Sequence, residues 1–417
     1  NVILFSEHTW GASASGTDPH SKFTKDLWEG KKAYADNASN QSQILYKQAL
    51  SPLHVDKGGD FVHVLNTNLW NRTDVVFLDS MVNLNEKELI TRTGEKVETQ
   101  RLYDGRWAFV AENIPALSSE VYQIVSKKKS SRRFVSMIAE NKILNNGIVR
   151  VEIDEVKGTI SSFKRVGDSY EYASNSGLND YLYTGRYASD PQGIEQILNI
   201  RVLDDGAVAA TLRIESKAPG CNTLWRDVTV YKGIDRVDIC NTLDKQDILD
   251  FENVRFVFPF NIQQPEITMD LAMSEIHPER EQLEGVNKHY YSLQNGLAVG
   301  DLEHAVCLTT VDAPFVELGS PSGLDYRLNP RHGYGWWQSA KISPIVYSWV
   351  MTNTWRTNYK ASQGGTAKFR YSLQPCNPLD LKLKQRGAER EMELVAVASR
   401  SSQNIEQVFR LKGCHRI

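Results

Sequence analysis

The stretch Val228-Thr229-Val230-Tyr231, followed after a short break by Val237-Asp238-Ile239-Cys240-Asn241, decides the fold class of this chain. Apolar residues recur at every second position in both segments, which is the two-residue period of a β-strand. Similar segments recur through most of residues 131–417, with no helical window of comparable quality. Such a run requires large stacked sheets, so we expect a mainly β chain with a β-supersandwich over 131–417. Further expected strands are Val149–Ile153, Val254–Phe260, Ile345–Val350, Lys368–Leu373 and Leu394–Ser399, the last completing a sheet edge.

A smaller β unit is expected ahead of the supersandwich, over residues 53–130. Short strands separated by Asn, Asp and Gly turns indicate a small β-sandwich. The run Lys127 to Arg133 is basic, and we interpret it as a solvated linker rather than a binding site. The expected strands are Phe61–Asn66, Val75–Leu78, Trp107–Val110 and Val121–Val125.

A long amphipathic helix or a helix pair, running to about Leu50, is expected near the start of the chain. Asp18-Pro19 is typical of a helix start, with Asp18 as N-cap, and Ser51-Pro52 ends the helix. A lone helix before β-structure needs a partner for its apolar stripe, so residues 1–52 are interpreted as the remnant of a helix bundle. Because the sequence starts at Asn1, we expect it to begin inside a larger protein. The stripe consists of Phe23, Leu27, Tyr34, Ala38 and Leu45.

Composition excludes several classes of partner. The chain has 417 residues, 41% hydrophobic and 24% charged, and 48 basic against 51 acidic residues give a formal charge of -3. This balance argues against a nucleic-acid or membrane-surface partner. No window approaches 18 uninterrupted apolar residues, so no membrane span is expected. The five cysteines show no C-x-x-C spacing and leave the redox compartment open.

The segment Leu4-Phe5-Ser6-Glu7-His8-Thr9-Trp10-Gly11-Ala12 places an imidazole beside a carboxylate and an indole. Taken alone, His8 is more often a hydrogen-bonded structural residue than a metal ligand. No histidine of the chain falls at H-x-H or H-E-x-x-H spacing, so local sequence shows no complete zinc site. No Gly-rich phosphate loop or G-x-S-x-G motif occurs either.

Aromatic residues with neighbouring asparagines gather between Gly333 and Tyr359. Aromatic faces stack on the C–H faces of sugars, and amides bind the hydroxyls, so sugar recognition is one interpretation. The alternative is that Trp349 and Trp355 belong to the core and that the asparagines shape turns. On sequence alone this alternative is favoured.

Read in order, these motifs resemble the C-terminal half of glycoside hydrolase family 38, the retaining zinc-dependent α-mannosidases, in particular the bacterial members. The resemblance runs from Leu4 to about Leu373. It implies a galactose-mutarotase-like supersandwich for the large β-domain. The motifs are the segments 4–12, 64–72 (Val-Leu-Asn-Thr-Asn-Leu-Trp-Asn-Arg), 114–117 (Ile-Pro-Ala-Leu), 179–183 (Asn-Asp-Tyr-Leu-Tyr), 311–314 (Val-Asp-Ala-Pro), 353–359, 364–365 and 369–371.

The resemblance also implies roles for single residues. His8 matches a zinc ligand at the head of a bundle helix, although the family's His-Asp-x-x-x-Gly-Thr pattern is replaced by His8-Thr9-Trp10-Gly11. Glu7 is a possible hydrogen-bond partner of that ligand, and Trp10 is expected to wall the pocket. Tyr181 is the best match to a tyrosine that reaches the sugar. Arg331 or Arg327 matches an arginine that does the same.

The family's other zinc ligands and both catalytic carboxylates belong to an N-terminal domain that this sequence lacks. Hydrolysis with retention of the anomeric configuration requires two carboxyl groups. One histidine is too few ligands for a zinc site. The chain alone is therefore expected neither to turn over substrate nor to hold zinc. The implied partners are mannose-containing oligosaccharides and the catalytic domain of the same protein, without nucleic acid. Oligomerisation and the compartment, bacterial periplasm or cytoplasm, stay open.

Two alternatives of other classes remain. One is a non-catalytic carbohydrate-binding or scaffold protein. The other is a mutarotase-like enzyme, since large β-supersandwiches can carry such sites. The sequence shows no convincing pair of general acid and base for the second alternative.

Overall fold

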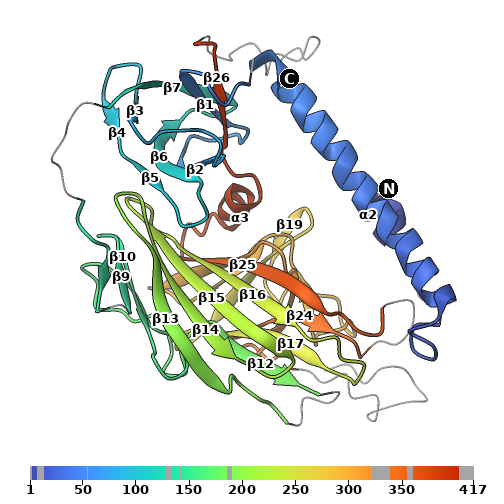
Figure 1. Cartoon of the computed structure of the whole chain (residues 1–417). Coiled ribbons are helices and arrows are strands. Elements are labelled where there is room, and N and C mark those ends of the chain that lie inside the picture. The colour runs from blue at the N-terminus through green and yellow to red at the C-terminus, as the bar shows by residue number, and fades with distance from the viewer. Residues whose placement is uncertain are drawn as a thin grey trace.

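A computed structural model of the chain describes residues 2–6, 14–53, 55–127, 134–140, 142–185, 190–321, 339–354 and 360–402. The fold is mainly β, as the strand pattern predicts, with a long helix running beside two β units (Figure 1). His8, Glu7, Trp10, Arg327 and Arg331 lie outside the described residues. In the part of the chain that is described, no helix has both the length and the apolar character needed to cross a bilayer.

The long helix is α2 (Lys22–Leu50), preceded by α1 (Val2–Ser6) and followed by the 3-10 turn η1 (Ser51–Leu53). The expected cap at Asp18 is wrong, because the Ser21 hydroxyl accepts the hydrogen bond from the Thr24 amide at 3.2 Å. The helix ends at Leu50, as the Ser-Pro stop predicts. Phe23 and Leu45 of the predicted stripe are 60% and 65% exposed.

The small β-sandwich packs a sheet of order β26-β1-β7-β3-β4 against one of order β2-β6-β5. Val64, Val76 and Phe109 are fully buried between them, so the expected strands of this region are confirmed. The strands are β1 (Phe61–Asn66), β2 (Arg72–Leu78), β3 (Lys87–Ile90), β4 (Lys96–Val97), β5 (Thr99–Arg101), β6 (Trp107–Ile114), β7 (Ser118–Ser126) and β26 (Val395–Ser399).

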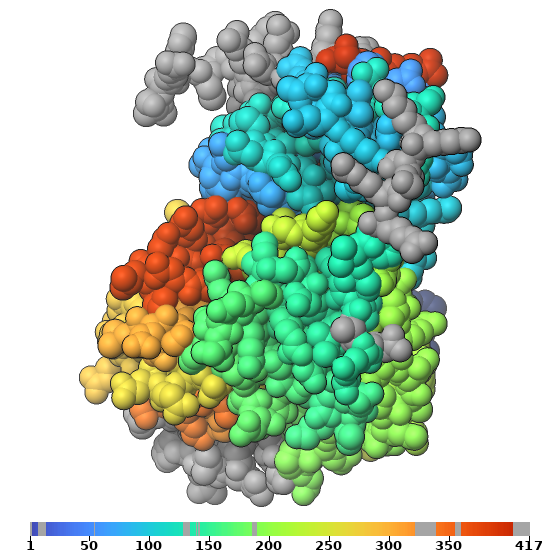
Figure 2. Space-filling model, turned by 90° about the vertical axis from the view of Figure 1, so that its left-hand side faces the viewer, coloured from blue at the N-terminus to red at the C-terminus, as the bar shows by residue number. Residues whose placement is uncertain are grey.

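Strand β26 corrects the expected extent of the large domain. It forms a sheet edge as predicted, but the sheet is that of the small sandwich: Phe61 pairs with Ser399 and Leu65 with Val395. In Figure 2 the red C-terminal part of the chain appears both at the junction of the two β units and at the far end of the small sandwich. The expected unit 131–417 is therefore too long, because the strand that follows helix α3 (Leu383–Glu391) pairs with the small sandwich.

In the described residues the supersandwich consists of three sheets. The largest has the order β13-β14-β15-β16-β25-β22-β21-β18-β19, the second β12-β17-β24-β23-β20, and the third β11-β10-β9-β8. One continuous apolar core joins them, including Phe163, Phe256 and Tyr371.

All strand pairs recorded for these sheets are antiparallel. The largest sheet contains β13 (Gln196–Asp205), β14 (Ala209–Lys217), β15 (Cys221–Tyr231), β16 (Val237–Lys245), β18 (Glu266–Leu271), β19 (Ser274–Ile276), β21 (Gly296–Gly300), β22 (Ala305–Thr310) and β25 (Gly365–Cys376). The others contain β8 (Ile138–Ala139), β9 (Ile143–Asn145), β10 (Val149–Ile153), β11 (Ile160–Arg165), β12 (Asp180–Thr184), β17 (Asn253–Pro259), β20 (Tyr291–Ser292), β23 (Phe315–Leu318) and β24 (Ile345–Thr352).

A buried charge network joins the two β units. Asp74 of β2 accepts from Arg72 at 2.7 Å and from Arg236 at 2.9 Å, and Arg236 also donates to Asp238 of β16 at 2.9 Å. Helix α3 (Leu383–Glu391) adds Arg390, which pairs with Asp238 at 3.3 Å. Since each carboxylate meets at least two guanidinium groups, the small sandwich is held in a fixed position on the largest sheet.

Candidate functional site

Tyr181 is the predicted substrate-binding residue that the structure describes. It lies in β12 with 1% of its surface exposed, and its hydroxyl donates to the Pro219 carbonyl at 2.6 Å. Its ring meets Phe256 edge to face, and burial raises its pKa well above the ordinary value. In this structure Tyr181 is a core residue, and its contact with a sugar stays a prediction.

Trp349 likewise belongs to the core. It is 8% exposed, and the Arg255 guanidinium lies 4.6 Å from its ring centroid. This agrees with the alternative in which the tryptophan is structural. The other aromatic residues of the predicted sugar-binding run, at 334–337 and 355–359, lie outside the described residues.

A polar cluster lies at the ends of β12, β16 and β24 and at the start of β17, and its members are Tyr183, Lys245, Glu252 and Asn353. We call it the Glu252 cluster. Glu252 accepts from the Tyr183 hydroxyl at 3.0 Å and pairs with Lys245 at 2.6 Å. The side chain of Glu252 is 6% exposed and that of Lys245 is 1% exposed. The cluster joins the two large sheets, because β16 belongs to one of them and β12, β17 and β24 to the other.

Local sequence explains how these side chains meet. Tyr183 follows Tyr181 by two positions and so shares its face of β12. Lys245 is the last residue of β16, and Glu252 directly precedes β17. Asn353 follows β24, accepts from the Glu252 amide at 2.7 Å, and donates to the carbonyls of Ile248, Asp250 and Ala361. One amide thus fixes the loop between β16 and β17.

Burial is the main influence on the Glu252 cluster. It raises the pKa of Glu252, while the bonds from Lys245 and Tyr183 act in the opposite direction. Burial and the Glu252 carboxylate both raise the pKa of Tyr183. Both oxygens of the carboxylate have partners, so this group is suited to holding loops rather than to transferring protons.

A polar cavity of about 460 Å³ adjoins the Glu252 cluster and shares Lys245 with it. Its lining offers amides and carboxylates, which are suitable partners for a ligand rich in hydroxyl groups. The lining residues are Asn222, Asp244, Lys245, Gln246, Asp247, Lys360, Gly364 and Gly365. Sequence reasoning missed this site except for Asn353 and the Gly364-Gly365 pair, which were noted in other roles.

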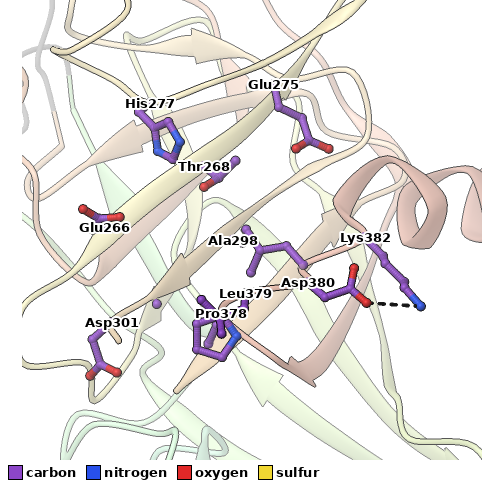
Figure 3. Close-up of a pocket in the computed structure, with 13 residues that line it drawn as sticks. Glu266, Thr268, Glu275, His277, Ala298, Asp301, Pro378, Leu379, Asp380 and Lys382 are labelled. Atoms are coloured by element: carbon purple, nitrogen blue, oxygen red, sulfur yellow. Dashed lines mark ion pairs between the residues drawn. The ribbon is translucent and has the colours of Figure 1, made fainter. Parts of the chain in front are cut away.

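A second cavity of about 460 Å³ lies on the outer side of the largest sheet, and we call it the His277 cavity (Figure 3). The Nδ1–H of His277 donates to the Ile267 carbonyl at 3.2 Å, and in the neutral imidazole Nε2 is then an acceptor. Carboxylates from separate segments of the chain line the same space as this imidazole. They are Glu266, Glu275, Asp301 and Asp380.

Metal binding by the described residues has little support. Within the ranges described, no group of three or more His, Cys, Asp or Glu side chains is placed to hold a metal ion. His8, the one zinc ligand that the resemblance places in this chain, lies outside these ranges. A zinc site at His8 stays a prediction.

Comparison with known proteins supports the architecture. The sequence matches no protein-family model and no curated protein. An alpha-mannosidase from Enterococcus faecalis V583 matches 90% of this chain with a TM-score of 0.63 and 11% identity. A glycosyl hydrolase family 38 protein from Enterococcus faecalis also matches 90%, with a TM-score of 0.66 and 12% identity.

This chain spans about half the length of the two enterococcal chains, 50% and 52%. This chain shares the fold of the part of each enterococcal chain that it matches. At this level of identity the likeness establishes fold alone. A galactose mutarotase-like protein from Lactobacillus casei ATCC 334 matches 58% of this chain with a TM-score of 0.35 and 12% identity, a likeness too weak to carry an argument.

Proposed function

We propose that this chain is the β-rich, C-terminal part of a retaining α-mannosidase of glycoside hydrolase family 38, which hydrolyses α-mannosidic bonds in glycans. The observation that carries the proposal is the fold shared with two enterococcal structures over 90% of this chain. The ordered motifs from Leu4 to Leu373 support it independently of the fold. The β units then brace a catalytic domain and supply the far rim of its cleft.

The site residues of this proposal come from both ends of the chain. His8 contributes one ligand to a zinc ion whose other ligands belong to the catalytic domain, and Glu7 holds its second nitrogen. Trp10, Tyr181 and Arg331 contact the sugar. Because Tyr181 is 1% exposed and bonded to Pro219, its role requires either a rearrangement of β12 or an indirect action through Tyr183.

The direct test is the coding region upstream of the Asn1 codon. We expect it to encode an α/β domain with zinc-ligating residues and an aspartate nucleophile. The extended protein is expected to hydrolyse nitrophenyl α-mannoside and to contain zinc by elemental analysis. Residues 1–417 alone are expected to give no hydrolysis above blank. An upstream region without such a domain, or turnover by residues 1–417, would overturn the proposal.

His8→Ala in the extended protein separates ligation from general disruption. We expect loss of zinc as well as activity, because a missing ligand lowers metal affinity directly. His20→Ala is the matched control, since His20 is an exposed loop residue 12 positions further along the sequence. Equal zinc contents in the two variants would remove His8 from the proposed site.

A second candidate is a mutarotase-like activity, favoured by the imidazole of His277 and the carboxylates that line one cavity. Anomerisation of a sugar needs a general base and a general acid, and these are residue types that fill such roles in enzymes. Polarimetry of a freshly dissolved α-anomer separates the candidates. Acceleration by residues 1–417 that disappears in His277→Ala would favour the second candidate, and an unchanged rate would dismiss it.

A further inference from the structure

Two buried thiols face each other on neighbouring strands of the largest sheet. Cys307 lies in β22 and Cys376 ends β25, and their Sγ atoms are 3.2 Å apart. Ala305 is the register partner of Cys376, and Cys307 is two residues further along β22, so both thiols lie on one face of the sheet. The cysteines are 1% and 6% exposed, and both are free.

The thiol pair adjoins the His277 cavity. Both cysteines pack in one small cluster with Ala298, Ala305 and Leu383. Ala298 and Ala305 also line the His277 cavity. One layer of side chains therefore separates the solvent in the cavity from the two sulfur atoms. Small fluctuations of this layer can admit a molecule as small as a peroxide.

The surroundings of the two sulfurs differ, which gives them different reactivity. The Cys307 hydrogen bond to Cys376, aided by Arg386 and Arg165, holds the pKa of Cys376 below its ordinary value against the effect of burial. The same contact and burial raise the pKa of Cys307. Arg165 also donates to the Pro375 carbonyl at 2.8 Å, which keeps its charge beside Cys376. The thiolate is the reactive form, and Cys376 is also the more exposed of the two cysteines, 6% against 1%, so we expect it to react first.

We propose that Cys307 and Cys376 form a dithiol site that a small peroxide converts into a cross-strand disulfide. The Cys376 thiolate attacks one peroxide oxygen, the O–O bond breaks, and a sulfenic acid forms with release of hydroxide. The Cys307 sulfur then attacks the sulfenic sulfur, the S–O bond breaks and water leaves. In total two thiols lose two protons and two electrons, and hydrogen peroxide is reduced to two waters.

The cross-link would fix one wall of the His277 cavity. Cys376 directly precedes the segment 377–382, whose Asp380 and Lys382 line that cavity (Figure 3). Joining β22 to β25 closes a long loop of the chain and restricts the unfolded state, so the oxidised protein should be more stable. This inference is independent of the proposed α-mannosidase function.

The experiment treats the folded full chain with hydrogen peroxide, blocks residual thiols with an alkylating reagent, and maps tryptic peptides by mass spectrometry. We expect a linked pair of the peptides His289–Arg327 and Tyr371–Lys382, two hydrogen masses below their sum, which dithiothreitol separates. Cys307→Ala and Cys376→Ala should each abolish the link, whereas Cys221→Ala and Cys240→Ala should keep it. Alkylation of both thiols after peroxide treatment of the unsubstituted chain would overturn the proposal.

Two further measurements guard against variants that fold poorly. In Cys307→Ser, which keeps a hydroxyl donor beside Cys376, a dimedone adduct should appear at Cys376, because the resolving thiol is missing. In the unsubstituted chain, peroxide should raise the thermal midpoint by several degrees, and dithiothreitol should reverse the rise. A dimedone adduct confined to other cysteines, or a midpoint that does not move while the linked peptide is absent, would contradict the site.

Discussion

Arg255 and Glu317 form an ion pair in which both side chains are 0% exposed. Arg255 lies in β17 and Glu317 in β23, so the pair crosses the intervening strand β24. Arg255 also lies over the Trp349 ring of that strand. The pair therefore ties three strands of one sheet together inside the core.

Removing one partner of this pair should be more damaging than removing both. Glu317→Gln leaves the guanidinium without its countercharge, and we expect a loss of about 3–5 kcal/mol in the free energy of unfolding. The double variant Arg255→Met/Glu317→Leu should be less destabilised than Arg255→Met alone or Glu317→Leu alone. Urea unfolding measures these three variants beside Glu317→Gln, and a double variant as unstable as the sum of its two singles would contradict the expectation.

The Asp74 network predicts acid lability. Burial acts to raise the pKa of Asp74, but Arg236, Arg72 and Arg390 outweigh it and hold the pKa below the ordinary value of 3.8. Because the folded-state pKa is depressed, the stabilisation is complete above the unfolded-state pKa. It is lost as the pH falls below about 4 toward the folded-state pKa.

Thermal unfolding between about pH 7 and pH 3 checks this prediction. Asp74→Asn should lower the midpoint at neutral pH, because a charge that faces several arginines is lost, and should flatten the decline below about pH 4. Asp26→Asn is the control, since Asp26 is 61% exposed on α2 and should keep the decline of the unsubstituted chain. If the thermal midpoint of Asp74→Asn fell equally steeply in acid, another group would be responsible for the loss of stability.

The two tyrosines of β12 should differ in their response to loss of the hydroxyl. Tyr181→Phe removes a bond to the neutral Pro219 carbonyl, and we expect a cost of about 0.5–1.5 kcal/mol. Tyr183→Phe removes a bond to the Glu252 carboxylate, for which about 1.5–3 kcal/mol is typical. Denaturant unfolding ranks the two variants, and the reverse order would show that Glu252 does not depend on Tyr183.

Gly59 should be required for the attachment of β26. A Cβ atom at Gly59 would lie 2.1 Å from the Ser399 carbonyl oxygen, so Gly59→Ala must displace the backbone at the end of β26. Hydrogen exchange of the amides of β1 and β26 is expected to accelerate. Gly58→Ala is the neighbouring control, because its Cβ would lie 3.5 Å from an Asp56 carboxylate oxygen. Unchanged exchange in Gly59→Ala would contradict the contact.

Regular elements could be predicted because their signals are local. Alternation alone located β15 and β16, and the Ser-Pro stop located the end of α2. The start of α2 was placed wrongly at Asp18, because Asp18 and Ser21 are both good N-cap residues and only the backbone path chooses between them. The sheet that receives β26 was equally hidden, since strand propensity carries no information about the partner strand.

The site residues were harder to predict, because they come together only through the pairing of strands that are distant in the sequence. Lys245 ends β16, Glu252 precedes β17, and Asn353 follows β24 and bonds to the Glu252 amide. No spacing in the sequence therefore marks the cluster. Cys307 and Cys376 show no motif spacing either, although β22 and β25 bring them together. His8, Trp10 and Arg331 rest on the resemblance to family 38 and stay predictions.

The pairing of β1 with β26 has a consequence for the order of events on the ribosome. Translation delivers β1 early, but its outer edge cannot be covered until residues 395–399 have emerged. The strands of the supersandwich, which lie between the two, are all available before that moment. An uncovered strand edge is a site for pairing with other chains. The β unit that is synthesised first is therefore the one completed last.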